Sequence, residues 1–180
     1  MQHDPERLER KFDELDDWKN ALLATLAGES AGRLAFRPDG KAWSALDVVH
    51  HLVLVEESIT GYARKKLQAP PQPVSLLDRA KRTLLVGLMR LPVRVRAPLP
   101  QVVPGETLPL DVLSSRWTRA RGDLRELVLS LPEERREALV FRHPVSGPLD
   151  PAGTLDFIDA HARHHEAQLR RIRRAPGYPG

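Results

Sequence analysis

The chain has 180 residues, a formal net charge of +4 and no cysteine. This length predicts one domain over residues 1–180, with its core at about 5–174, and the lack of cysteine excludes disulfides, iron–sulfur clusters, thiolate zinc sites and a cysteine nucleophile. The 28 Lys and Arg are interspersed with 24 Asp and Glu and aromatic residues make up only 5%, so the composition argues against a nucleic-acid partner.

A first helix is predicted between Pro5 and Ala27, where apolar residues recur every three or four positions. Asp4 before Pro5 is typical of an N-cap followed by proline at the first helical position. Residues 28–42 contain several glycines and a proline, which predicts a loop with at most a turn of structure.

A second helix is predicted to begin after Trp43, with Ser44 as its cap and Asp47 as the partner in a capping box. Its core stripe reads Val48, His51, Leu52, Val55, Ile59 and Tyr62. A histidine on such a stripe needs a partner for its ring nitrogens, because burying them unsatisfied is costly. His50 is the alternative to His51 as a site residue, but it points off the stripe and is expected at the surface or its boundary.

A long crossover is predicted over the proline-rich residues 69–109, since such a connection joins parallel neighbours in some helix bundles. Within it, residues 75–91 carry apolar residues at helical spacing and predict a covering helix. A less favoured alternative is an amphipathic segment that touches a membrane through its basic side. That side would consist of Arg79, Lys81, Arg82 and Arg90.

Two further bundle helices follow the crossover. Apolar periodicity over residues 110–131 predicts the third, which Pro132 ends. Residues 139–149 contain prolines and a glycine that predict an ordered turn, and no strand pattern is evident anywhere. Asp150 and Pro151 then predict the start of the fourth helix. The sequence therefore predicts an all-α four-helix bundle whose Pro-rich crossover carries an extra helix between bundle helices 2 and 3.

The start of the chain is charged and does not resemble a signal peptide. No stretch approaches the ~20 uninterrupted apolar residues that cross a bilayer. We therefore expect a cytoplasmic protein without a membrane partner.

Three histidines form the main functional candidate. His161 and His165 lie four residues apart on the apolar face of the fourth helix, so their rings stand one turn apart. Their nitrogens can converge on one ion at about 2.0–2.1 Å, the usual zinc–imidazole distance. His51 can join them, because bundle helices pack with their apolar stripes facing. We predict a metal site of His51, His161 and His165 with an open position, as in catalytic sites.

Three neighbouring side chains have predicted supporting roles. Gln168, one turn beyond His165, either orients a ligand or a bound water or caps the polar edge of the helix. His143 is expected near the mouth of the site or in a hydrogen bond that stabilises its turn. His164 lies three residues from His161 and could substitute for His165, but it is expected beside the ligands or at the surface.

The nearby acidic residues do not provide an evident general base. Asp47 lies one turn before His51 and either accepts its second N–H or, as we favour, caps its own helix. Glu56 and Glu57 are expected to face partly away from the site.

Several motifs occur together in one order and spacing: Trp43-Ser44 before His51-Leu52, then His143-Pro-x-x-Gly-Pro-Leu149, then His161-x-x-x-His165-x-x-Gln168. This combination, across about residues 18–172, resembles the DinB/YfiT-like superfamily of metal-dependent enzymes. The resemblance implies a four-helix bundle with one long crossover. It also places the three metal ligands of that family on His51, His161 and His165.

Members of that superfamily share a scaffold but differ in chemistry, and include bacillithiol- or mycothiol-dependent transferases, an isomerase and hydrolases. The resemblance implies a divalent ion, Zn or Ni, that lowers the pKa of a bound water or of a low-molecular-weight thiol co-substrate. Hydrolysis or thiol S-transfer on a small molecule would follow. The alternative is a metal-stabilised or metal-free small-molecule binding module. A homodimer is compatible with the resemblance, but no exposed heptad specifies one.

Overall fold

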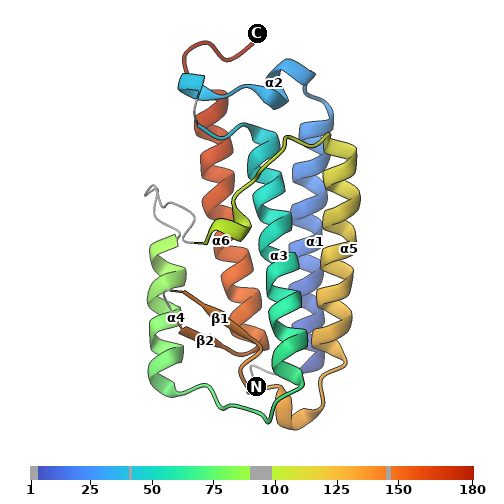
Figure 1. Cartoon of the computed structure of the whole chain (residues 1–180), viewed down its shortest axis with the longest axis vertical. Coiled ribbons are helices and arrows are strands. Elements are labelled where there is room, and N and C mark those ends of the chain that lie inside the picture. Colours follow the sequence, from blue (N-terminus) through green and yellow to red (C-terminus); the bar gives the residue numbers. More distant parts are fainter. Residues whose placement is uncertain (1–3, 41, 90–98, 145–146) are drawn as a thin grey trace.

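The computed structural model describes residues 4–40, 42–89, 99–144 and 147–180 (Figure 1). Its bundle consists of α1 (Pro5–Ala27), α3 (Ala45–Leu67), α5 (Leu110–Leu129) and α6 (Pro151–Arg173). Helices α1 and α6 run in one direction and α3 and α5 in the other, so α3 and α5 are parallel neighbours. The predicted helical bundle is confirmed, and the long connection between α3 and α5 explains their parallel packing.

The predicted helix starts are confirmed by their capping hydrogen bonds. The carboxylate of Asp4 accepts from the backbone of α1, and that of Asp150 accepts from Gly153 N at 2.7 Å. Ser44 and Asp47 form the predicted capping box at the start of α3. Each cap satisfies backbone N–H groups that the first helical turn leaves without a partner.

The segment before α3 is more ordered than predicted. It contains a five-residue helix, α2 (Ala31–Ala35), and a 3₁₀ turn, η1 (Pro38–Gly40). Ser30 caps α2 by accepting a hydrogen bond from Arg33 N. The glycines nearby led us to predict a loop, so this helix start was missed. This segment brings Asp39 and Trp43 to the same end of the bundle as the C-terminal part of α6.

The predicted covering helix is α4 (Leu76–Met89), which lies along α6 (Figure 1). Leu85 joins the core, and Arg82 is buried with its guanidinium 3.4 Å from the Asp150 carboxylate. The outer side of α4 exposes Leu76, Leu77, Leu84 and Leu88. Arg82 therefore makes an ion pair inside the protein. This position contradicts the alternative prediction, in which Arg82 belonged to a basic side that faces a membrane. Arg90, the last residue of that basic set, lies outside the described residues.

A short antiparallel hairpin corrects the prediction that the chain has no strand. Strand β1 (Phe141–His143) pairs with β2 (Gly147–Leu149), with Phe141 opposite Leu149 and His143 opposite Gly147. Gly147 has a φ of 79°, a left-handed conformation that glycine adopts without steric strain. Strands of three residues are too short to show an alternating pattern in the sequence, so only an ordered turn over residues 139–149 was predicted.

The helices hold their apolar faces together through buried side chains such as Phe12, Ile59, Leu124 and Leu155. Among the described helices, none is both long and apolar enough to span a bilayer.

Candidate metal centre

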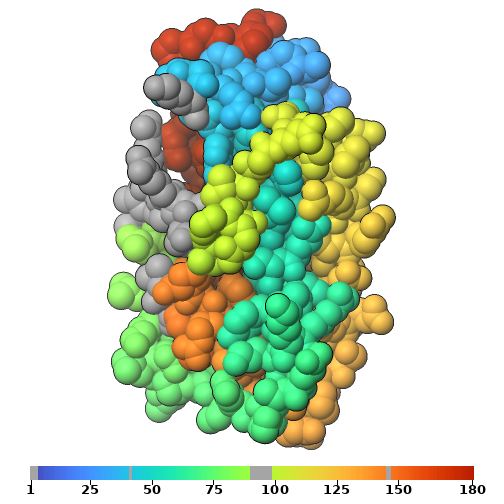
Figure 2. All heavy atoms as spheres, in the orientation of Figure 1, coloured from blue at the N-terminus to red at the C-terminus, as the bar shows by residue number. Residues whose placement is uncertain are grey.

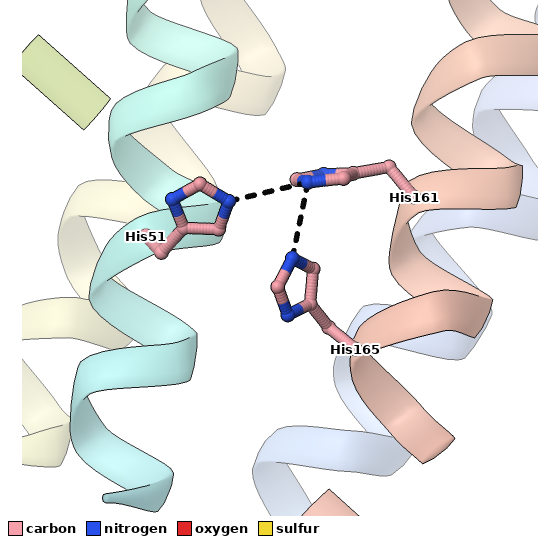
Figure 3. Close-up of side chains that lie close together, drawn as sticks. All are labelled: His51, His161 and His165. Carbon is pink, nitrogen blue, oxygen red and sulfur yellow. Dashed lines mark hydrogen bonds between the residues drawn. The ribbon is translucent and has the colours of Figure 1, made fainter. Parts of the chain in front are cut away.

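Three histidine rings from two antiparallel helices point at one another inside the bundle (Figure 3). His161 Nε2 lies 3.2 Å from His51 Nε2 and 3.1 Å from His165 Nε2. One nitrogen from each ring falls within 4.8 Å of the other two. We call these residues the histidine trio. The predicted convergence of His51 from α3 with His161 and His165 from α6 is therefore present in the fold.

The trio is enclosed by aromatic side chains. The rings of Trp43 and His51 are 4.9 Å apart between centroids, and Trp43 also stacks on His165 at 6.3 Å. Phe157 stacks on His161 at 5.3 Å, from one helical turn earlier on α6. These contacts restrict ring rotation, so the three imidazoles are held in the orientation that directs their nitrogens inward.

Two of the trio have their tautomers set by hydrogen bonds on the opposite nitrogen. His51 Nδ1–H donates to the Val102 carbonyl oxygen at 2.6 Å, and His165 Nδ1–H donates to Gln168 Oε1 at 2.8 Å. A carbonyl or amide oxygen only accepts, so the proton of each neutral ring lies on Nδ1. Both Nε2 atoms therefore direct lone pairs at the third ring, as metal-ligating histidines do.

The chemistry of this donor set fits a cation. His161 Nε2 faces two lone pairs but can donate at most one hydrogen, so one of the two contacts lacks a donor. Three nitrogens on a tetrahedral zinc ion would lie about 3.3 Å apart if each bond were about 2.05 Å. The two short nitrogen–nitrogen distances are close to that separation.

Burial keeps the trio neutral. Burial is the main cause that lowers the pKa of His165, to about 3, and the nearby His51 adds to it. Burial also lowers the pKa of His51, and it lowers that of His161 well below the usual histidine value. A neutral imidazole is the form that binds a metal, so near pH 7 protons compete little for these nitrogens.

A cavity of about 780 Å³ opens beside the trio. In Figure 2 the surface is hollowed beside the red α6, below the light-blue residues that precede α3. The lining is mainly apolar and includes Val55, Leu85, Met89, Phe141 and Phe157. Such a volume and lining suit a small molecule that buries most of its surface.

The other predicted histidines take different positions. His143, on β1, packs against Phe157 with the two ring centroids 4.7 Å apart and their planes tilted by 52°, and it lines the cavity. Burial lowers its pKa to about 4. His164 is buried rather than at the surface, and its Nδ1 lies 3.2 Å from the Met89 carbonyl oxygen. His50 is also buried, contrary to prediction, and its Nε2 lies 3.4 Å from Arg116 Nη1 on α5.

The acidic residues near His51 serve other contacts. Asp47 caps α3, as predicted, and it also pairs with Arg37. The Nδ1–H of His51 donates to the Val102 backbone carbonyl instead. Glu56 bonds to Arg121, and Glu57 bonds to Arg116, so both face α5. Neither glutamate is available to the trio as a base.

Three contributors were absent from the sequence prediction. Phe157 and Arg171 stand on the same face of α6 as the trio, at helical spacing from His161 and Gln168, and that spacing could have identified them. Val102, in η2 (Pro100–Val102), accepts a hydrogen bond from His51 through its backbone carbonyl. A backbone contact of this kind cannot be predicted from a pattern of side chains.

A family model described as the DinB superfamily matches residues 7–169, which is most of the chain. No curated protein and no solved structure matches the chain.

Proposed function

Because the chain belongs to the DinB superfamily and gathers three histidines beside a cavity, we propose that it is a metal-dependent enzyme that joins a low-molecular-weight thiol to a small electrophile. The observation that carries the proposal is the convergence of three neutral imidazoles, two with fixed tautomers, at the wall of an apolar cavity. A site that faces a cavity leaves room for a co-substrate next to the ligands.

In this proposal His51, His161 and His165 hold one divalent ion, with Zn or Ni favoured because imidazole is a good ligand for both. Bound there, such an ion would lower the pKa of a thiol that occupies the remaining position. The Val102 carbonyl and Gln168 hold His51 and His165 in their metal-binding tautomers. Trp43 and Phe157 limit the access of water to the rings.

Thiol transfer is favoured over hydrolysis by the charges around the site. Glu56 and Glu57 bind arginines on α5, and the low pKa of His143 makes it a weak base. A thiol whose pKa has been lowered ionises near neutral pH without a general base, so thiol transfer does not need the base that the described residues of the site lack. The thiol proton is released to solvent, and the thiolate sulfur forms a bond to the electrophilic carbon. The bond from that carbon to the leaving group breaks, and the leaving group takes the electron pair.

Two other functions remain as alternatives. A hydrolase is the second candidate, and the position of His143 in the cavity wall favours it, since that residue could contact a substrate. A binding module without turnover is the third, and the largely apolar cavity would be sufficient for it.

We expect tag-free protein loaded with one equivalent of Zn²⁺ or Ni²⁺ to conjugate N-acetylcysteine with 1-chloro-2,4-dinitrobenzene, releasing chloride. Mass spectrometry would detect the thioether, and metal-free protein is the control. Hydrolysis of a p-nitrophenyl ester without thioether formation would favour the hydrolase. Metal uptake without turnover in either assay would favour the third candidate, a binding module without catalytic activity.

Gln168→Ala should lower the metal affinity by about 10- to 100-fold, the usual effect of removing the partner that orients a ligating histidine. His165 would lose the acceptor for its Nδ1–H, so its ring could rotate or change tautomer. Competition with a chromophoric chelator would measure the affinity. Gln168→Glu is the matched control, because a carboxylate still accepts this hydrogen bond. Equal affinities for Gln168→Ala and the wild type would remove this orienting role.

A further inference from the structure

Among the described residues that line the cavity, the one arginine has no counterion. Arg171 lies in the last turn of α6 and lines the cavity, partly buried. No described carboxylate lies within ion-pairing distance of it, and the residues outside the described ranges contain no Asp or Glu. Its neighbours differ, because Arg170 pairs with Glu166 and Arg173 pairs with Glu29.

The position of Arg171 is not explained by the helix end alone. Positive side chains in a last turn interact favourably with the helix dipole, but Arg170 and Arg173 already provide that charge. Of these three arginines, Arg171 is the one that lines the largely apolar cavity, where an uncompensated charge is unfavourable. Asp39, the only acidic residue in the described lining, forms no ion pair with it and accepts from Ala42 N instead.

Arg171 lies close to the histidine trio. It lies six positions after His165, which is about 9 Å along the helix axis. Burial is the main cause of the lowered pKa of His165, and the positive charge of Arg171 adds to it.

We propose that Arg171 binds the carboxylate end of the molecule that occupies the cavity, so that the preferred ligands are small carboxylic acids with an apolar middle. A planar guanidinium can hold a carboxylate through two parallel hydrogen bonds. The opposite, reacting end then lies at the trio, in contact with the apolar wall formed by Leu85, Met89 and Phe141. In placing the reacting end there, the inference rests on the proposed function.

The test uses 4-phenylbutyrate and its amide, 4-phenylbutanamide, which share an apolar body and differ in charge. Calorimetric titration is done on metal-free and Zn-loaded protein, because a carboxylate could also bind the metal directly. We expect the metal-free wild type to bind the acid about tenfold or more tightly than the amide, the usual range for a charged hydrogen-bonded pair. Arg171→Gln should bring the two affinities to near equality.

Arg170→Gln is the matched control, since it removes a neighbouring charge on the exposed side of α6, and it should keep the preference. Arg171→Lys should retain part of it, because a positive charge remains without the planar fork. A preference for the acid that survives Arg171→Gln, or the lack of any preference in the wild type, would overturn the assignment. Failure to take up Zn²⁺ with the preference intact would count against the metal enzyme alone.

Discussion

His161→Ala is expected to abolish binding of the divalent ion that we propose for the histidine trio. His161 Nε2 is the central atom of the three, within 3.2 Å of both partners, so its loss leaves two nitrogens that face an empty volume. Two imidazoles alone are a weak site for Zn²⁺. Elemental analysis of tag-free protein should give about one equivalent of metal for the wild type and none for the variant.

The same variant should lose the thermal stabilisation that an added metal provides. A ligand present at 100 times its Kd stabilises the folded state by about 2.7 kcal/mol, which raises the melting temperature of the wild type. His161→Ala should melt at one temperature with or without Zn²⁺, and this comparison separates metal loss from misfolding. His50→Ala is the control, because His50 contacts Arg116 and not the trio. Stoichiometric metal in His161→Ala would refute the site.

The helices and their starts could be predicted because each rests on local chemistry. Asp4 with Pro5, and Ser44 with Asp47, specify caps within a few residues, so the predicted and observed starts coincide. The histidine trio was predictable for a related reason. Helical spacing places His161 beside His165, and the stripe of α3 places His51 inward.

Contacts between segments that are distant in the sequence could not be predicted from such local patterns. The Val102 carbonyl that orients His51 belongs to a crossover with no regular pattern, 51 residues away along the chain. His50 was expected at the surface or its boundary because it lies off the apolar stripe, yet it is buried, with its Nε2 3.4 Å from Arg116 Nη1 of α5. Hydrophobic periodicity does not record such polar contacts between helices.

A buried ion pair between α3 and α5 is a third contact of this kind. Glu56 of α3 is 3% exposed and Arg121 of α5 is 2% exposed. Arg121 Nη2 and Nε donate to the two Glu56 oxygens at 2.6 and 2.8 Å, and Trp117 Nε1 donates to Oε1 at 2.8 Å. Burial alone would lower the pKa of the Arg121 guanidinium, but Glu56 and Asp16 raise it above its usual value.

Glu56→Ala should lower the free energy of unfolding by about 3–5 kcal/mol, the usual cost of removing one partner from a buried pair. Arg121 would keep its charge with only Asp16 to balance it, and the Trp117 N–H would lose its acceptor. Urea denaturation followed by circular dichroism would measure the loss. Glu57→Ala is the matched control: Glu57 pairs with Arg116 at the surface, so its removal should change stability by about 0–1 kcal/mol.

A double variant separates the strength of the pair from the penalty of breaking it. In Glu56→Leu with Arg121→Met, both charges give way to apolar side chains, so no buried ion is left without a counterion. We expect this protein to be clearly more stable than Glu56→Ala, because most of the cost of the single change is the stranded guanidinium. If the double variant were as unstable as Glu56→Ala, lost packing between α3 and α5 would explain the effect instead.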